Sequence, residues 1–182
     1  MQDQQNRNAR RKRLLRRLLR LAGMAVLAAV AVFLAVRVVD ALRSSGGSSG
    51  GSGGWLVPCS YTSITSPFGN RKSPTAGASS YHQGVDLDTG TGDPVYATRA
   101  GVVTIAGWGN AAGNYVQINH QDGFSSIYMH LRDYCVSAGQ IVSAGQLIGA
   151  TGATGITTGD HLHFGISYNG VYVNPCNYVA LY

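Results

Sequence analysis

The chain has 182 residues, enough for one domain, and carries 14 Lys/Arg against 8 acidic residues, a net charge of +6. Residues 1–54 hold ten Lys/Arg and two Asp, a balance of +8, whereas residues 55–182 hold four Lys/Arg and six Asp, a balance of −2. The basic charge therefore lies outside the expected domain, which argues against nucleic-acid binding. All eight acidic residues are Asp. A hydrolytic site must then use His, Asp or Tyr, because no Glu is present to act as base or acid.

The N-terminal part predicts a membrane anchor. Residues 1–20 are rich in arginine, and the uncharged apolar run 21–36 follows before Arg37. Sixteen helical residues rise about 24 Å, somewhat less than the roughly 30 Å hydrocarbon core, but two further valines extend the apolar surface. We therefore expect a single-pass transmembrane helix over residues 21–39, with the basic tail 1–20 in the cytoplasm and the rest of the chain extracytoplasmic. A cleaved signal peptide is the alternative, because small residues follow the run.

A Gly/Ser-rich linker is expected over residues 40–54. Its core, "SSGGSSGGSGG", has no side chain able to pack and should behave as a random coil with an average span of roughly 18 Å. Such a linker would keep the following domain close to the membrane surface. An artificial fusion junction would have the same composition.

Residues 55–182 predict an all-β domain. Short runs of β-branched and aromatic residues such as "GVVTIAGW", "NYVQINH", "SSIYMHL" and "HLHFGISY" alternate with breaks rich in Gly, Asn, Asp and Ser, and no twelve-residue window has a helical stripe. We expect a mostly antiparallel sheet with long loops. The repeat "VSAGQIVSAGQL" predicts two short strands that turn at the same Ala-Gly pair as a hairpin.

The three cysteines, Cys59, Cys135 and Cys176, have no CxxC spacing, which disfavours a structural zinc site made of cysteines. In an extracytoplasmic domain they allow one disulfide, and all three pairings remain open.

The histidines form a pattern that suggests a metal site. The five are His82, His120, His130, His161 and His163. His82 lies four residues before Asp86 in "YHQGVDLD", and His161 and His163 would share one face of a strand. A hydrolytic zinc site needs three nitrogen or oxygen ligands and an open position. His82, Asp86 and one of the C-terminal histidines would supply them, although a scattering of structural histidines is the alternative. His120, before an Asp-Gly turn, is interpreted as structural.

The order HxxxD, then "YMHL", then "GDHLHFG" resembles the M23 family of peptidoglycan metallopeptidases, of the lysostaphin and LytM type. The similarity continues through "ITSPFGNR" and "NGVYVNP" and covers nearly all of residues 55–182. The resemblance implies a small antiparallel β fold with a substrate groove and one Zn²⁺ at its floor. It also implies that His82, Asp86 and His163 bind the zinc, whereas His130 and His161 handle protons.

Together with the expected membrane anchor, this resemblance implies a membrane-anchored zinc endopeptidase that cuts peptide bonds in peptidoglycan stem peptides or cross-bridges. In this reading His161 is the base for a water molecule, and His130 donates to the carbonyl oxygen or the oxyanion. Two alternatives are a non-catalytic scaffold or activator module and a structural metal-binding domain, but the presence of all five positions favours the enzyme. Where relatives often have "GPHLHFE", this chain has Asp160 and Gly165, neither of them a ligand position, so the expected difference is in groove polarity.

Overall fold

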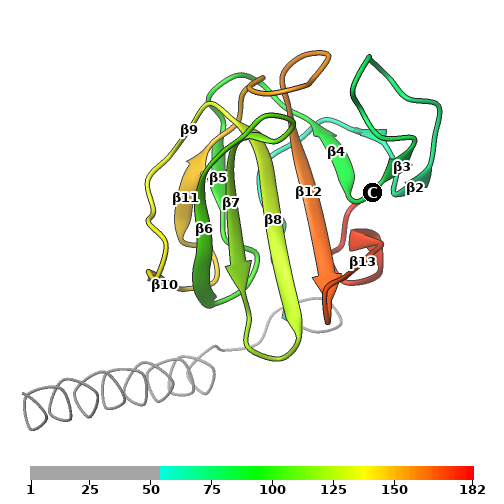
Figure 1. Ribbon diagram of the computed structural model, residues 1–182. Coiled ribbons are helices and arrows are strands. Elements are labelled where there is room, and N and C mark those ends of the chain that lie inside the picture. The colour runs from blue at the N-terminus through cyan, green and yellow to red at the C-terminus, as the bar shows by residue number, and fades with distance from the viewer. Residues whose placement is uncertain (1–53) are drawn as a thin grey trace, which may run out of the picture. The chain divides into compact units, whose positions relative to one another are not determined.

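The structure, a computed structural model, describes residues 54–182 (Figure 1). The expected basic tail, the transmembrane helix over residues 21–39 and almost all of the linker over 40–54 lie outside the described residues. Among residues 54–182, no helix has the length and apolar character needed to cross a bilayer.

The described residues form an all-β domain with antiparallel strand pairing throughout, as predicted, and contain one 3-10 helix and no α-helix. The elements are β1 (Ile64–Ser66), β2 (Gly69–Asn70), β3 (Tyr81–His82), β4 (Val85–Asp88), β5 (Pro94–Tyr96), β6 (Gly101–Gly109), β7 (Gly113–Asn119), β8 (Phe124–Leu131), β9 (Asp133–Tyr134), β10 (Ile141–Val142), β11 (Leu147–Ala150), β12 (His161–Tyr168), β13 (Val171–Val173) and η1 (Pro175–Asn177).

The main sheet has the strand order β1-β4-β12-β8-β7-β6-β10, and β13 also pairs with β12. A three-stranded sheet, β5-β11-β9, and the two-stranded sheet β2-β3 complete the domain. Figure 1 shows the late strand β12 between β8 and the early strand β4. This insertion brings residues 82–86 next to residues 161–163, nearly eighty positions later in the chain.

Alternation along β12 separates the core from the opposite face of the sheet. Leu162, Phe164 and Ile166 are fully buried, and each contributes about 1.5–3 kcal/mol through the burial of its side chain. Because neighbouring strand residues point to opposite faces, His161 and His163 leave β12 together on the other side. The register of β12 is therefore fixed by its apolar residues, which in turn fixes where its histidines lie.

The sequence repeat makes the same turn twice but not the predicted hairpin. The amide of Ser137 donates to the side-chain oxygen of Gln140 (3.1 Å), and the amide of Ser143 donates to that of Gln146 (3.0 Å). The strand after the first turn, β10, pairs with β6, whereas the strand after the second, β11, pairs with β5 and β9. The two strands do not pair with each other, so the predicted hairpin is wrong.

The three cysteines are free thiols, and the possible disulfide does not form. Cys59 is buried in the core, where burial and then the negative charge of Asp93 raise the pKa of its thiol to about 12. Cys135 and Cys176 are exposed.

His120 belongs to a buried polar chain, in agreement with its interpretation as structural. Its Nδ1 lies 2.9 Å from the carbonyl oxygen of Ala100, and its Nε2 lies 2.9 Å from the hydroxyl of Ser126. Ser126 is hydrogen-bonded to Tyr128 (3.0 Å), whose hydroxyl also accepts from the amide of Thr98 (2.9 Å). Since a carbonyl only accepts, Nδ1 carries the hydrogen, and the ring fits this network as neutral imidazole.

His120 should make folding stability depend on pH. Burial lowers its pKa to about 4 in the folded protein, against 6.5 for an unperturbed histidine. As pH falls below 6.5, the unfolded chain binds a proton that folded His120 does not bind, so stability is lost down to about pH 4. We expect the difference in unfolding free energy between wild type and His120→Gln to shrink by up to about 3 kcal/mol between pH 7 and pH 4. Urea denaturation with a chelator present measures this, and a difference independent of pH would contradict the assignment.

Candidate metal centre

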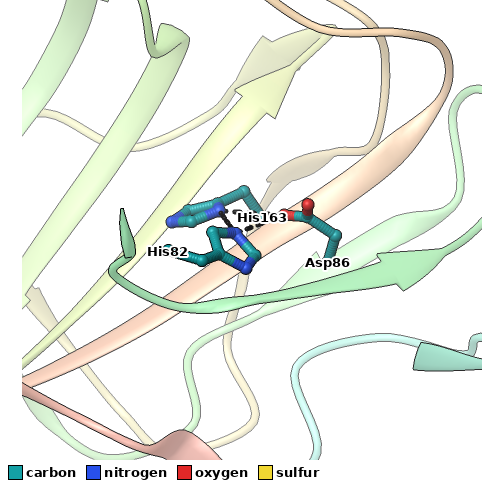
Figure 2. A group of neighbouring side chains, drawn as sticks. All are labelled: His82, Asp86 and His163. Atoms are coloured by element: carbon teal, nitrogen blue, oxygen red, sulfur yellow. Dashed lines mark hydrogen bonds and ion pairs between the residues drawn. The ribbon is translucent and has the colours of Figure 1, made fainter. Parts of the chain in front are cut away.

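Three buried side chains from three strands converge on the non-core face of the main sheet (Figure 2). Asp86 on β4 and His163 on β12 are directly opposite in the strand register, and His82 ends β3. His82 Nε2 lies 3.0 Å from Asp86 Oδ1 and 2.9 Å from His163 Nδ1, which is 2.9 Å from Asp86 Oδ1. The structure thus brings together the three ligands implied by the resemblance, with one donor atom from each residue facing the other two.

The hydrogen bonding of this triad fits a bound cation. His82 Nδ1 lies 2.9 Å from the carbonyl oxygen of Pro67, so Nδ1 carries the hydrogen and Nε2 has a free lone pair. That lone pair faces Asp86 Oδ1, which is also an acceptor, and two buried acceptors in contact need a proton or a cation between them. Two imidazole nitrogens and one carboxylate oxygen suit zinc, whose tetrahedral ligands lie roughly 3.3 Å apart.

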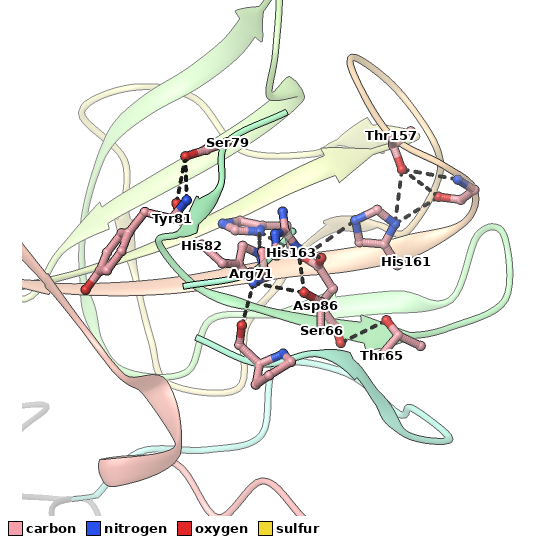
Figure 3. Close-up of polar contacts among 12 residues, drawn as sticks. Thr65, Ser66, Arg71, Ser79, Tyr81, His82, Asp86, Thr157, His161 and His163 are labelled. Carbon is pink, nitrogen blue, oxygen red and sulfur yellow. Dashed lines mark hydrogen bonds and ion pairs between the residues drawn. The ribbon is translucent and has the colours of Figure 1, made fainter. Parts of the chain in front are cut away.

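Asp86 is held as a carboxylate by contacts to both of its oxygens. Burial alone would raise the pKa of Asp86, but its close contacts with His163 and His82 outweigh burial and hold the pKa far below its usual range. The other oxygen, Oδ2, accepts from Arg71 Nη1 at 2.9 Å, and Nη1 also donates to the hydroxyl of Ser66 (Figure 3). The guanidinium therefore orients Asp86 so that Oδ1 faces the two histidines.

Arg71 was not assigned to the site by the sequence reasoning. Its side chain is 19% exposed and forms the ion pair with Asp86 described above. The available signal was its position at the end of "ITSPFGNR", one of the segments that carry the resemblance.

Gly84, between His82 and Asp86, allows β3 and β4 to approach β12. A Cβ atom at this position would lie 2.5 Å from the carbonyl oxygen of Phe164 and 2.8 Å from Nε2 of His163. Only glycine fits without moving either the backbone of β12 or the ring of His163.

A methyl group at Gly84 should therefore damage the metal centre. We expect Gly84→Ala to weaken zinc affinity and to lower the free energy of unfolding by about 1–3 kcal/mol, the usual effect of overpacking. The matched control is Gly107→Ala, because a Cβ at Gly107 meets nothing within 4 Å. Chelator competition and urea denaturation of both variants provide the measurements. Equal effects of the two substitutions would contradict this role of Gly84.

His130 and His161 lie beside the triad, so the structure brings all five predicted residues together. Their ring centroids are 4.8 Å apart, and His161 Nε2 lies 3.6 Å from Asp86 Oδ1. His161 Nδ1 donates to the carbonyl oxygen of Gly159 (2.9 Å), and His130 Nδ1 donates to that of Thr154 (2.8 Å). In the neutral rings, both Nε2 atoms therefore carry lone pairs and can accept protons.

In its resting state, His130 lacks the proton that its expected role as a hydrogen-bond donor requires. Burial lowers the pKa of His130 to about 4, so its ring is neutral at pH 7 and its Nε2 is an acceptor. His130 can donate from Nε2 only after it has taken up a second proton. A donor role thus requires a proton that another step of the reaction supplies.

An irregularity in β8 turns His130 toward the site. A regular strand would send His130 to the same side as Tyr128, which is fully buried in the core. Tyr128 pairs with Val116, and Leu131 pairs with Asn114. Two residues of β8 therefore lie opposite a single residue of β7. His130 itself has a φ of 62°, and its amide donates to the carbonyl oxygen of Ala112 at 2.8 Å. This bulge re-aims the side chain from the core to the opposite face.

Two clefts meet at the metal centre. One has a volume of about 420 Å³ and the other of about 260 Å³. Both are lined by Arg71, Ala78, His130, Ile156 and His163. A bound chain could therefore pass across the centre from one cleft into the other.

Sequence similarity to known proteins shows which family this chain belongs to. Residues 80–175 match Peptidase family M23. The DD-carboxypeptidase/endopeptidase Mpg of Neisseria meningitidis is 40% identical over 126 residues, which cover 69% of this chain and 29% of that protein. An uncharacterized metalloprotease of Haemophilus influenzae is 42% identical over 114 residues, 62% of this chain and 24% of that protein. The chain thus spans less than a third of the length of these relatives.

Solved structures agree with this result. A zinc-containing peptidase from Vibrio cholerae has a TM-score of 0.59 at 38% identity, covering 64% of this chain and 37% of that chain. The catalytic domain of lysostaphin from Staphylococcus simulans has a TM-score of 0.56 at 36% identity, covering 60% and 86%. A structure of the SpoIIQ-SpoIIIAH pore-forming complex has a TM-score of 0.62 at 27% identity, covering 69% and 90%. The family match over residues 80–175, with the metal-centre geometry within it, shows that the chain belongs to peptidase family M23.

Proposed function

We propose that this protein is a zinc endopeptidase that hydrolyses peptide bonds in the stem peptides or cross-bridges of peptidoglycan. The observation that carries the proposal is the convergence of His82, Asp86 and His163 beside two histidines with free Nε2 atoms. A relative named peptidoglycan DD-endopeptidase ShyC, from Vibrio cholerae, is 36% identical over 119 residues. This relative supports peptidoglycan as the substrate.

In the proposed mechanism, His82 Nε2, Asp86 Oδ1 and His163 Nδ1 would hold the zinc ion. When bound, zinc supplies a Lewis acid that polarises a carbonyl group and lowers the pKa of water. His161 accepts the proton of the attacking water at Nε2, because its Nδ1 hydrogen is committed to Gly159. His130, fixed by Thr154, is the second proton carrier: its Nε2 takes up the remaining proton of the same water and donates it to the leaving amine.

The proposal is tested with purified full-length protein loaded with zinc and incubated with peptidoglycan sacculi. We expect peptide fragments to be released, and release to stop when a chelator is added. Mass spectrometry of the fragments identifies the bond that is cut. Sacculi that stay intact in the presence of the zinc-loaded protein would overturn the enzyme assignment.

We further propose that residues 21–39 anchor the protein in the cell membrane, with the N-terminus in the cytoplasm and the catalytic domain outside. The support is the charge distribution around the apolar run, with the basic residues concentrated before it. Protease added to cells with an accessible outer membrane face should remove residues 55–182. Full protection of this segment would contradict the orientation.

A non-catalytic scaffold or activator module is the second candidate. It is favoured by the similarity to the structure of a pore-forming complex. A scaffold would bind sacculi or a cell-wall hydrolase without releasing fragments itself, so the sacculus experiment distinguishes the two functions.

A further inference from the structure

The lining of the larger of the two clefts has one positive charge more than its carboxylate can neutralise. Residues 55–182 contain four Lys/Arg, and two of them, Arg71 and Lys72, line this cleft. The only acidic side chain in its lining is Asp86, which already contacts two histidines and Arg71. Within the described part of the chain, Lys72 forms no ion pair. The cleft is therefore cationic in a domain whose net charge is −2.

The rest of this lining is also suited to an anion, whereas the smaller cleft is not. Thr75 and Thr158 also line the larger cleft, and a threonine hydroxyl can donate a hydrogen bond. The smaller cleft shares Arg71 but contains no lysine and no carboxylate, and small or apolar side chains such as Ala111 and Met129 form much of its lining. The two sides of the metal centre thus differ in the chemistry they offer to a peptide.

Arg71 is already held in position. Its Nη1 donates to Asp86 Oδ2 and to Ser66, which fixes the guanidinium plane at the border of the two clefts. Its buried Nε has no hydrogen-bond partner within residues 54–182, so the acceptors of the domain do not saturate the guanidinium. Lys72, the next residue, is exposed and contributes a mobile point charge beside this fixed group.

We propose that Arg71 and Lys72 form a cationic subsite that binds a carboxylate of the substrate peptide on the larger-cleft side of the scissile bond. This inference deepens the proposed function and rests on it. The fixed guanidinium sets the position of the carboxylate, and Lys72 adds attraction that selects a negatively charged peptide over a neutral one. The apolar smaller cleft takes the uncharged side of the same peptide.

The test compares two cross-linked stem peptides that differ only in one group, a free carboxylate or its carboxamide, next to the cleaved bond. The measured quantity is the ratio of kcat/KM for the two peptides, determined with the full-length zinc-loaded protein at low ionic strength. We expect wild type to prefer the carboxylate and Lys72→Met to lower the ratio about threefold to fivefold, the size typical of one exposed charge pair. Lys72→Glu should lower it further, and added salt should reduce the wild-type preference.

Arg132→Met is the matched control, because it also removes one exposed positive charge but does not line either cleft. Its ratio should equal that of wild type. A ratio that does not change in Lys72→Met and Lys72→Glu would overturn the subsite, even if both peptides are cut. If wild type cuts neither peptide, the proposed hydrolytic function fails, and the Kd values of the same two peptides then decide the subsite. Equal Kd values overturn the subsite. Tighter binding of the carboxylate peptide by wild type, lost in Lys72→Met, supports it.

Discussion

Replacing His163 with alanine should remove zinc binding and hydrolysis together. Its Nδ1 lies 2.9 Å from both His82 Nε2 and Asp86 Oδ1, so the substitution removes one of the three atoms that converge on the proposed metal position. We expect zinc affinity to fall by more than about 100-fold, because losing a residue that merely hydrogen-bonds to a metal ligand already lowers affinity by up to about 100-fold. Competition with a chromophoric chelator measures the affinity, and fragment release from sacculi measures the activity.

The control for this experiment is His120→Gln, a histidine substitution away from the centre. His120 is buried among Ala100, Ser126 and Trp55, and it lines neither of the two clefts. The variant should be less stable but should bind zinc as wild type does at a temperature where it is folded. If His163→Ala binds zinc as tightly as wild type, the assigned ligand set is wrong.

Replacing His161 with alanine should instead remove turnover and leave most of the zinc affinity. Its Nε2 is 3.6 Å from Asp86 Oδ1, too far for a good hydrogen bond, and it is not part of the converging triad. We expect zinc affinity to change by less than about tenfold, whereas kcat should fall by about 10²–10⁴, the usual effect of losing a general base.

The two alanine variants therefore test the division of roles between histidines that are one residue apart. Zinc content and kcat measured on the same preparations separate metal loss from loss of the proton acceptor. Equal losses of zinc in His161→Ala and His163→Ala would contradict this division, and unchanged kcat in His161→Ala would exclude it as the base.

Local sequence patterns predicted those parts of the site that depend on strand periodicity. The alternation in "HLHFGISY" placed His161 and His163 on one face, because the apolar residues between and after them must enter the core. The same periodicity would misplace His130. A regular β8 would have sent this side chain to the core side with Tyr128, and the bulge that redirects it has no clear sequence signal.

Repeated local patterns also did not determine strand pairing. Both copies of the "VSAGQ" repeat form the same turn, since the side-chain amide of the glutamine satisfies the serine amide within each copy. The partners of the following strands depend on which sheet edge lies nearby, so β10 and β11 join different sheets.

By itself, the sequence determined the all-β class and the core face of β12, because these follow from side-chain periodicity, whereas the four histidines and one aspartate of the site came from the resemblance to the M23 family. Only the tertiary structure decided that Arg71 holds Asp86, that Pro67 leaves the Nε2 lone pair of His82 free, and that Lys72 lies in a cleft whose one carboxylate is already paired with Arg71. The physical reason is that hydrogen-bond geometry and local charge depend on contacts between segments far apart in the chain. No local pattern encodes those contacts.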